Sequence, residues 1–387
     1  MRQQVDILYV GFLLGHAGDA LQMLSLAAGM QRRGASVQIV VPELPTSVAF
    51  AALCEERGVP CLRSGCVRAD MHRNRQYLLA LLRLFRRFRA SVTHLHTGDV
   101  CPPRLATVAM DLAHVPPAVA TVQSPYATLL PGSRRARSWA RAVARRYRAV
   151  VCPSEHARAH QLAAGVPADR VRVIRNSVDT KRFGSGDRAL IRDRLGMPED
   201  ARVVLFTSRL DAQKRPLDAV RAFAAAAKGR PGTYLVFAGS GSEREAILRE
   251  ASALGQAERV RCVGYQTDIQ NWLAAADVWI LPTEAENFSL ALLEAMAAGC
   301  PVLTTLCAGN DEVVEHERNA LVVPVGDVEA LADGLTRLLD DPEMRSRLAR
   351  GAKETAARYD EEAMVTAYAA CYSESCGAPS GTGSDSG

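Results

Sequence analysis

Apolar residues recur in short runs along the chain, and longer segments with apolar positions at helical spacing separate these runs. The runs are apolar on both faces and alternate with helical segments, which predicts parallel sheets with helices on either side. In the first half they are Ile7–Val10, Val37–Val41, Val92–Leu95, Val119–Val122 and Val150–Val151. In the second half they are Val203–Phe206, Tyr234–Phe237, Val260–Val263, Val278–Leu281, Val302–Thr304 and Leu321–Val323. We therefore expect an α/β protein built from doubly wound, Rossmann-like domains.

The pattern of runs restarts after a segment that contains Gly184-Ser185-Gly186-Asp187 and Met197-Pro198-Glu199-Asp200. These turn-forming residues predict a linker, and a chain of 387 residues is long enough for two domains. The predicted division is a first domain at 1–180, a linker at 181–201, a second domain at 202–360, a C-terminal helix at 361–376 that crosses back to the first domain, and a disordered Gly/Ser-rich tail at 377–387. Because doubly wound domains bind ligands at the carboxyl ends of their strands, the default site is a cleft across which the two domains face each other.

Composition and charge exclude several classes of protein. Hydrophobic content of 48% and charged content of 23% are those of globular domains, and a net charge of +5 does not indicate a nucleic-acid partner. The ten Cys are scattered without a C-x-x-C pair, which favours reduced thiols in a cytoplasmic enzyme. No apolar run reaches the roughly 18 residues of a membrane span, and the N-terminus opens on the strand-like Val5–Val10 rather than on a signal peptide. A soluble, cytoplasmic protein is the expectation.

The most informative stretch of sequence runs from Pro282 to Pro301. Ser289 is a good N-cap, the residues from Leu290 to Ala298 form a nearly all-apolar helix, and Gly299 before Pro301 is a stop signal. Within this short, buried helix Glu294 is the one charged residue. An unpaired buried carboxylate is costly, so Glu294 requires a polar partner, and we consider either a ligand hydroxyl or an internal salt bridge.

A second carboxylate, Glu286, lies just ahead of the helix cap. The N–H groups of Asn287, Phe288 and Ser289 are free to point at a polar or anionic ligand, because the first N–H groups of a helix have no partner within it. Two carboxylates that flank a helix N-terminus suit a ligand with sugar hydroxyls at both ends and phosphates between.

Glu286 and Glu294 match the E-x7-E signature of retaining GT-B glycosyltransferases, and the surrounding sequence resembles glycosyltransferase family 4. The resemblance implies the GT-B fold, with Glu294 on the ribose hydroxyls and Glu286 on the hydroxyls of the transferred hexose. It also implies donor contacts from the segment of Asn287, Phe288, Ser289 and Leu290. Asn287 stands where relatives often carry Gly, which implies an altered sugar preference.

A pair of cations follows the predicted strand Val203–Phe206. Arg209 and Lys214 lie five residues apart on a strand-to-helix loop and suit a diphosphate that gains charge as the glycosidic bond breaks, although a solvated surface pair is the alternative. The segment resembles the family's G-R-L-x-x-x-K, with Ser208 for Gly. In the family these cations replace the metal of GT-A enzymes, and this chain has no D-x-D motif. We therefore expect neither a metal nor a cofactor.

Two Gly-containing loops add weaker support. Gly239-Ser240-Gly241 follows Tyr234–Phe237 and resembles a family element, so Gly239 is predicted to contact the donor, although such a pair often marks only a tight turn. In the first domain the loop from Gly15 to Asp19 matches the position of the family's Gly-Gly loop, but Ala17 replaces one Gly. Only Gly18 is carried over as a phosphate-side contact, and a plain turn is the alternative.

The first domain also contains candidates for contacts with the acceptor or the sugar. His94-Leu95-His96-Thr97 resembles the family's H-x-H, and alternation along the strand places both His on one face. His96 is predicted to reach the cleft, and a structural role is the alternative. Gln123 stands where relatives usually carry His, and because Gln cannot act as a base, its presence implies an unusual acceptor.

The resemblance implies front-face substitution, in which the donor phosphate takes the acceptor proton and Arg209, Lys214 and Glu286 form the catalytic set. The favoured reaction moves a hexose from a donor of the UDP-glucose or UDP-N-acetylglucosamine type to a small soluble acceptor in natural-product biosynthesis. Alternatives are a GDP-sugar-dependent transferase acting on a lipid or glycan, a sugar-nucleotide epimerase and a non-catalytic sugar-nucleotide-binding protein. A NAD-dependent oxidoreductase requires G-x-G-x-x-G after the first strand, and the first loop lacks that spacing.

Two Arg-rich segments are candidates for contact with a membrane surface. The segment from Leu78 to Phe88 reads as a crossover helix with a solvated Arg face, which we favour over a membrane-surface helix because it leads directly into a strand. The segment from Arg134 to Arg148 is similar, or lines a route for an anionic acceptor.

Overall fold

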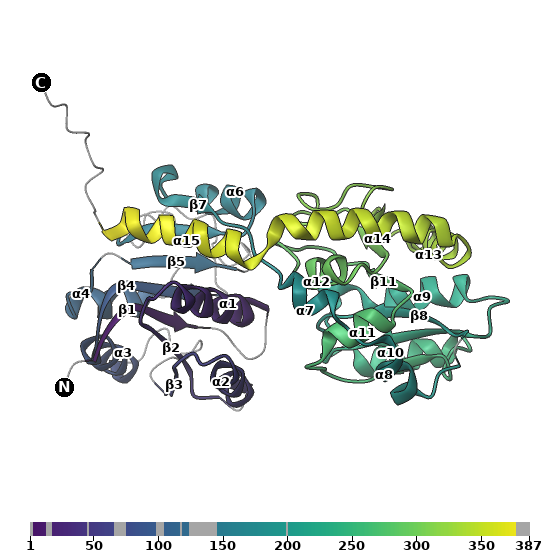
Figure 1. Cartoon of the computed structure of the whole chain (residues 1–387), viewed down its shortest axis with the longest axis horizontal. Coiled ribbons are helices and arrows are strands. Elements are labelled where there is room, and N and C mark those ends of the chain that lie inside the picture. Colours follow the sequence, from purple (N-terminus) through teal and green to yellow (C-terminus); the bar gives the residue numbers. More distant parts are fainter. Residues whose placement is uncertain are drawn as a thin grey trace, which may run out of the picture. The chain divides into compact units, whose positions relative to one another are not determined.

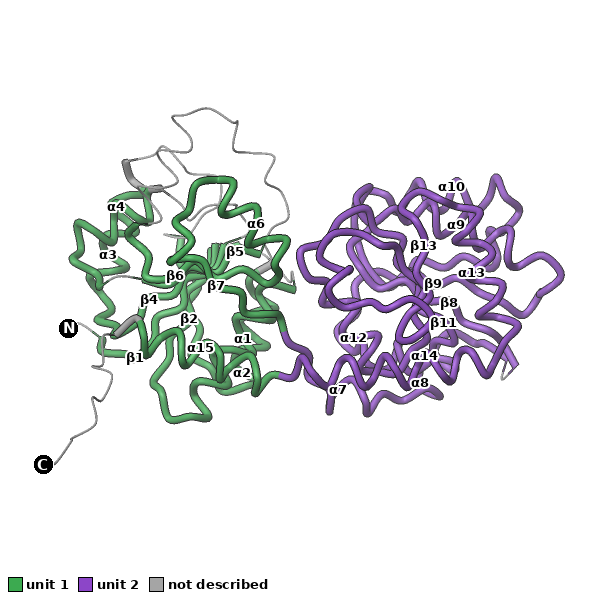
Figure 2. Tube along the Cα trace, turned by 90° about the horizontal axis from the view of Figure 1, so that it is seen from above, with its two compact units in different colours: residues 1–176, 361–387 green, residues 177–360 purple. Residues whose placement is uncertain are grey.

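The computed structural model describes residues 3–12, 18–44, 46–65, 75–97, 104–116, 118–123, 145–198 and 200–376. The chain forms two compact units, which Figure 2 colours separately. Unit 1 comprises residues 1–176 and 361–387, and unit 2 comprises residues 177–360. Each unit contains one parallel sheet with helices packed on it, so the predicted α/β class with two Rossmann-like domains is confirmed (Figure 1). In the part of the chain that the structure describes, none of the helices has both the length and the hydropathy of a membrane span.

The sheet of unit 1 has the order β3-β2-β1-β4-β5-β6-β7 with every pair parallel. Its strands are β1 (Gln3–Gly11), β2 (Val37–Pro42), β3 (Cys61–Ser64), β4 (Phe88–Thr97), β5 (Ala118–Val122), β6 (Tyr147–Cys152) and β7 (Val171–Val173). Its α-helices are α1 (Gly18–Arg32), α2 (Thr46–Glu56), α3 (Arg75–Arg87), α4 (Arg104–Leu112), α6 (Glu155–Ala163) and α15 (Glu361–Cys376).

The sheet of unit 2 has the order β10-β9-β8-β11-β12-β13, again parallel throughout. Its strands are β8 (Arg202–Phe206), β9 (Thr233–Phe237), β10 (Val260–Cys262), β11 (Val278–Leu281), β12 (Val302–Thr305) and β13 (Leu321–Val323). Its α-helices are α7 (Thr180–Gly184), α8 (Arg188–Leu195), α9 (Pro216–Ala226), α10 (Arg244–Ala253), α11 (Ile269–Ala275), α12 (Leu290–Ala298), α13 (Val328–Asp340) and α14 (Pro342–Ala356). The strand order reverses between β8 and β11, which is the place where doubly wound sheets bind ligands.

Residues 181–201, expected to form a linker, contain α7 and α8 and group with unit 2. Asp179 and Asp187 cap these helices through their side chains, which is why turn-forming residues accompany them. Phe183 and Ile191 are buried in the core of unit 2. Gly186 allows a close approach, since a Cβ there would lie 2.1 Å from the carbonyl oxygen of Gln270.

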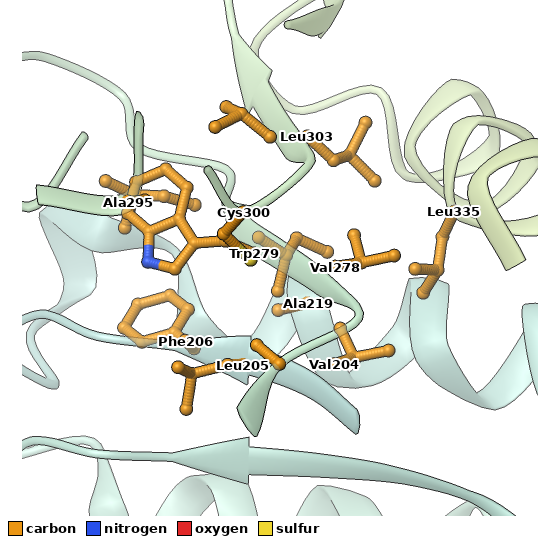
Figure 3. Packing of buried hydrophobic residues seen from close by; sticks show 14 of the residues in the cluster. Val204, Leu205, Phe206, Ala219, Val278, Trp279, Ala295, Cys300, Leu303 and Leu335 are labelled. Carbon is orange, nitrogen blue, oxygen red and sulfur yellow. The ribbon is translucent and has the colours of Figure 1, made fainter. Parts of the chain in front are cut away.

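The core of unit 2 fixes the strand ends that carry the candidate site. Trp279 of β11 lies against Phe206 of β8 and Ala295 of α12 (Figure 3). Its indole nitrogen donates a hydrogen bond of 2.7 Å to the hydroxyl of Thr207, the first residue after β8. Because the buried ring of Trp279 extends from β11 and packs against β8 and α12, it fixes the positions of these three elements relative to one another.

Helix α15 returns the chain to unit 1 and completes its core (Figure 1). Val365, Tyr368 and Tyr372 are buried there. A Cβ on Gly29 of α1 would lie 2.2 Å from a methyl group of Val365, so the two helices approach closely at this point.

The basic helix α3 leads directly into β4, as a crossover helix does. Its apolar residues Leu81, Leu84 and Phe85 are buried, while Arg83 and Arg86 are exposed. The proposed Gly-rich loop at residues 15–17, residues 134–144 of the second basic segment and the tail 377–387 lie outside the described residues.

Candidate active site

Most of the predicted donor-site residues lie at the carboxyl ends of the strands of unit 2. The loops involved follow β8, β9, β11 and β12, on both sides of the point where the strand order reverses. The sequence predicted one site that contains Arg209, Lys214, Gly239, Glu286 and Glu294. In the structure the first four lie in loops at the carboxyl ends of the strands of one sheet, and Glu294 lies in the helix that follows one of these loops.

The loop after β8 carries the two predicted cations. Asp211 caps a short 3-10 turn, Ala212–Lys214, by accepting a hydrogen bond from the backbone N–H of Lys214. Arg209 pairs with Asp211 at 2.9 Å and its side chain is 65% exposed, whereas Lys214 is buried. The two cations therefore differ in environment: Arg209 is hydrated and Lys214 is not.

The loop after β11 ends in the predicted helix. α12 spans Leu290–Ala298, Ser289 caps it by accepting from the N–H of Leu292, and Gly299 ends it in the left-handed conformation. The predicted helix, its cap and its stop are confirmed. Glu286 lies three residues before the cap.

Lys214 and Glu286 form a buried ion pair, in which Nζ donates to Oε1 at 2.6 Å. The two side chains are 9% and 10% exposed. The sequence predicted phosphate as the partner of Lys214 and sugar as the partner of Glu286, and it gave no sign that the two side chains pair with each other. Their separation of 72 residues explains this, because no local pattern links them.

Gln213 is a site residue that the sequence analysis missed. Its side chain donates to the carbonyl of Ala285 at 2.6 Å, and its own carbonyl accepts from the N–H of Glu284 at 2.9 Å. Gln213 thus joins the loop of Lys214 to the loop of Glu286. The signal in the sequence that could have identified Gln213 as a site residue is its position next to Lys214.

The loop after β12 supports Glu286 from another side and was also missed. The N–H of Glu286 donates to the carbonyl of Ala308 at 3.3 Å, and Gly309 has a φ of +85°. Burial raises the pKa of Cys307 to about 12, and the charge of Glu286 adds to this rise while Lys214 opposes it. Cys307 therefore lies close to both members of the ion pair as a neutral thiol.

Glu294 is half-buried in α12. Burial raises its pKa to about 7, and the charge of Arg182 opposes this rise only in part. Arg182 itself donates to the carbonyl of Thr267 at 2.9 Å and to the side chain of Gln270. Within the described ranges, no side chain donates a hydrogen bond to Glu294 and no cation lies within ion-pair distance of it, so the internal salt bridge is absent there.

The glycines after β9 allow two loops to pack together. A Cβ on Gly239 would lie 1.9 Å from the carbonyl oxygen of Ser208, and a Cβ on Gly241 would lie 2.2 Å from that of Leu210. The backbone of Leu210 donates to Ser240 at 2.9 Å. The Gly-x-Gly motif thus holds the loop that carries Arg209.

His94 and His96 of β4 lie on one face of the sheet, as alternation predicts, with ring centroids 4.1 Å apart. His94 is held between Tyr372 at 2.6 Å and Thr121 at 2.7 Å, which is a structural role. His96 is fully buried, burial lowers its pKa to about 3, and neither ring nitrogen has a hydrogen-bond partner among the described residues. It is therefore a neutral imidazole.

Gln123 follows β5 and forms a reciprocal amide pair with Asn176. Each side-chain nitrogen donates to the oxygen of the other residue, at 3.0 and 3.2 Å. This pairing fixes the orientation of the Gln123 amide. Gly18 is the first residue of α1, and the loop before it is outside the described part of the chain. Gly18, His96 and Gln123 belong to unit 1, whereas the other predicted site residues belong to unit 2.

Two family models match the chain in succession. The model described as "Glycosyltransferase Family 4" matches residues 18–182, and the model described as "Glycosyl transferases group 1" matches residues 187–355. Together they span most of both units.

Curated relatives match over about half of their own length. D-inositol 3-phosphate glycosyltransferase of Saccharomonospora viridis is 37% identical over 225 residues, which cover 55% of this chain and 52% of the relative. The lipopolysaccharide core biosynthesis glycosyltransferase LpsE of Rhizobium meliloti is 34% identical over 199 residues, covering 51% and 56% respectively. N-acetyl-alpha-D-glucosaminyl L-malate synthase of Bacillus anthracis is 30% identical over 207 residues, covering 53% and 54%.

Solved structures match over nearly the whole chain. Anabaena HepE, in complex with UDP and glucose, superposes with a TM-score of 0.81 at 20% identity over 96% of this chain and 100% of that one. WaaG, a glycosyltransferase of lipopolysaccharide biosynthesis, gives a TM-score of 0.69 at 18% identity over 94% and 98%. The successive family matches, the E-x7-E segment that ends within α12 and this shared fold show that the chain belongs to the family 4 glycosyltransferases of GT-B fold.

Proposed function

We propose that the protein is a retaining glycosyltransferase that uses a nucleotide-diphosphate sugar without a metal ion. The observation that carries the proposal is Glu294, a carboxylate in an otherwise apolar helix that ionises with difficulty and has no partner among the described residues. The two hydroxyls of a ribose supply the hydrogen-bond donors that such a carboxylate requires.

The neighbouring loops suit the rest of a nucleotide sugar. Arg209 and Lys214 provide positive charge for the diphosphate, and the N–H groups that precede α12 add donors at a helix N-terminus. Glu286 then accepts hydrogen bonds from hydroxyls of the hexose. These two cations supply the charge stabilisation that a metal supplies elsewhere, so neither a metal nor another cofactor is needed.

In the proposed reaction an acceptor oxygen bonds to the anomeric carbon on the face from which the phosphate leaves. The bond between the anomeric carbon and the phosphate oxygen breaks, and the departing phosphate takes the acceptor proton. Arg209 and Lys214 stabilise the negative charge that develops on the leaving group. Glu286, which lies 2.6 Å from Lys214, positions the hexose.

We propose a UDP-hexose, of the glucose or N-acetylglucosamine type, as the donor and a small soluble molecule as the acceptor. HepE, whose fold this chain shares, is in complex with UDP and glucose, which makes UDP the first nucleotide to test. Two of the relatives are named for small acceptors, D-inositol 3-phosphate and L-malate. The alternative, a GDP-sugar-dependent transferase with a glycan or lipid acceptor, has support from the lipopolysaccharide enzyme LpsE among the relatives.

The first test measures binding by thermal shift with UDP, GDP, ADP and NAD. We expect one nucleoside diphosphate to stabilise the wild type and to lose about tenfold or more in affinity in Glu294→Ala, because the ribose hydroxyls lose their acceptor. Preference for NAD, or no response to any nucleoside diphosphate, contradicts the proposal.

Measurement of turnover distinguishes a transferase from an epimerase and from a non-catalytic binding protein. A transferase releases nucleoside diphosphate only with an acceptor or, slowly, with water, and NMR of the product shows the α or β configuration retained from the donor. An epimerase changes the sugar without an acceptor, and a binding protein gives no product. Undiminished activity in excess EDTA is expected of a site that needs no metal.

A further inference from the structure

The loops that carry Lys214 and Glu286 are held in fixed register by their backbones. The contacts of Gln213 join them on one side. On the other side Gly309 packs so closely that a Cβ there would lie 2.5 Å from the carbonyl oxygen of Glu286. A bound ligand is therefore expected to change the hydrogen-bond partners of Lys214 and Glu286 and to leave the distance between their loops unchanged.

The ion pair between these loops is nearly closed to water. Both side chains are about nine-tenths buried and their charged atoms lie 2.6 Å apart. Removing the partner of a buried charge is strongly unfavourable, because water cannot take its place. The pair of Arg209 and Asp211 in the same loop is different, since Arg209 is 65% and Asp211 27% exposed and water replaces either partner at little cost.

We propose that the Lys214–Glu286 pair makes the site discriminate between an intact nucleotide sugar and the nucleoside diphosphate that remains after transfer. This inference rests on the proposed function. A diphosphate that takes Lys214 as its counter-ion leaves Glu286 buried without a donor. The hexose of an intact donor brings hydroxyls to Glu286 at the same moment, so both charges stay satisfied. Glu286 is thus a specificity-determining residue that acts by disfavouring the product.

The same reasoning predicts coupling between the two halves of the donor. A free sugar that occupies Glu286 weakens its hold on Lys214 and so favours binding of the diphosphate. By linkage, the diphosphate favours binding of the sugar by the same factor. The coupling acts through one ion pair and requires no movement of the fold.

The experiment is isothermal titration calorimetry on the full chain. The probes are whichever of UDP, GDP and ADP binds most tightly, its glucose conjugate, and free glucose or N-acetylglucosamine. In the wild type we expect a free sugar to tighten binding of the diphosphate about threefold or more. In Glu286→Gln, which keeps the shape and removes the charge, we expect the diphosphate to bind about tenfold more tightly than in the wild type and the sugar effect to vanish.

Asp211→Asn is the matched control. It removes a carboxylate from a cation in the same loop, retains the cap of the turn, and acts on an exposed pair. Diphosphate affinity is expected to change less than about threefold. The sugar coupling in the wild type needs no variant, so it tests the inference even if Glu286→Gln fails to fold.

The outcomes distinguish failure of the inference from failure of the proposed function. If a nucleoside diphosphate binds but neither free sugar affects it, or if Glu286→Gln tightens it no more than Asp211→Asn does, the inference is wrong and the proposed function stands. If none of the three nucleoside diphosphates binds, the proposed function fails and the inference fails with it.

Discussion

Glu294 shows how one side chain couples the stability of unit 2 to pH. Burial raises its pKa from 4.5 to about 7, so the folded protein holds this proton more tightly than the unfolded chain does. Between these two values the free energy of unfolding falls as pH rises, and above about pH 7 the full destabilisation is present. A carboxylate that lowers the stability of the protein is expected where the side chain serves to bind a ligand.

Glu294→Gln is therefore expected to stabilise the protein at pH 8 by about 1–3 kcal/mol, after allowance for partial exposure. The gain should shrink as pH falls from 7 towards 4.5 and should vanish below 4.5, where the carboxyl of the wild type is protonated in both the folded and the unfolded state. Chemical denaturation followed at pH 5, 6.5 and 8 measures this. Glu286→Gln is the control and should destabilise at pH 8, because it leaves Lys214 buried beside a neutral partner. A Glu294→Gln variant less stable than the wild type at pH 8 contradicts the assignment.

At the scale of elements, the loops after β8, β11 and β12 work as one assembly around Glu286. Gly309 occupies the tightest point, where φ is +85° and the nearest neighbours are backbone atoms of Glu286 and Asn287. Backbone atoms cannot turn aside as a flexible side chain does, so a methyl group at Gly309 must displace the segment that carries Glu286.

Gly309→Ala is expected to weaken binding of the nucleotide sugar about tenfold or more and to lower stability. Gly255→Ala is the matched control, because Gly255 also has a positive φ, +67°, but a Cβ there meets nothing within 4 Å. Both variants should lose about 1 kcal/mol of stability from backbone strain, and only Gly309→Ala should lose affinity. Calorimetric titration beside thermal denaturation distinguishes the two effects, and equal affinities in both variants contradict the proposed role of this loop.

The sequence predicted elements better than it predicted contacts, for physical reasons. α12 was readable because its cap, apolar run and stop are consecutive in the chain. The edge strands β3 and β7 were missed because they are short and partly exposed, so their hydrophobic pattern is weak. The segment of α7 and α8 resembles a linker in sequence, since the Asp residues that cap a helix also favour turns. The pairing of Lys214 with Glu286 depends on how β8 and β11 lie side by side, which periodicity does not reveal.

At the scale of the whole molecule, the chain leaves unit 1 after Asn176 and returns to it at Glu361. Unit 1 is therefore incomplete until the last helix is made. The hydroxyl of Tyr368 lies 2.9 Å from that of Thr121 on β5, and Tyr372 meets His94 on β4, so α15 supplies both apolar packing and partners for buried polar groups. Folding of unit 1 thus depends on residues separated by most of the sequence, whereas unit 2 is continuous.

A chain that ends at Asp360 tests this division of labour. Removal of α15 exposes the core of unit 1 and leaves His94 without one partner, so β1, β4 and β5 should lose hydrogen-exchange protection while β8, β11 and β12 keep theirs. A chain that ends at Cys376 retains all of α15 and is the control. The predicted donor residues of unit 2 all precede Asp360, so the shorter chain keeps them. We expect it still to bind nucleoside diphosphate. Equal loss of protection in both sheets would show that the two units unfold as a single cooperative body, with α15 stabilising both.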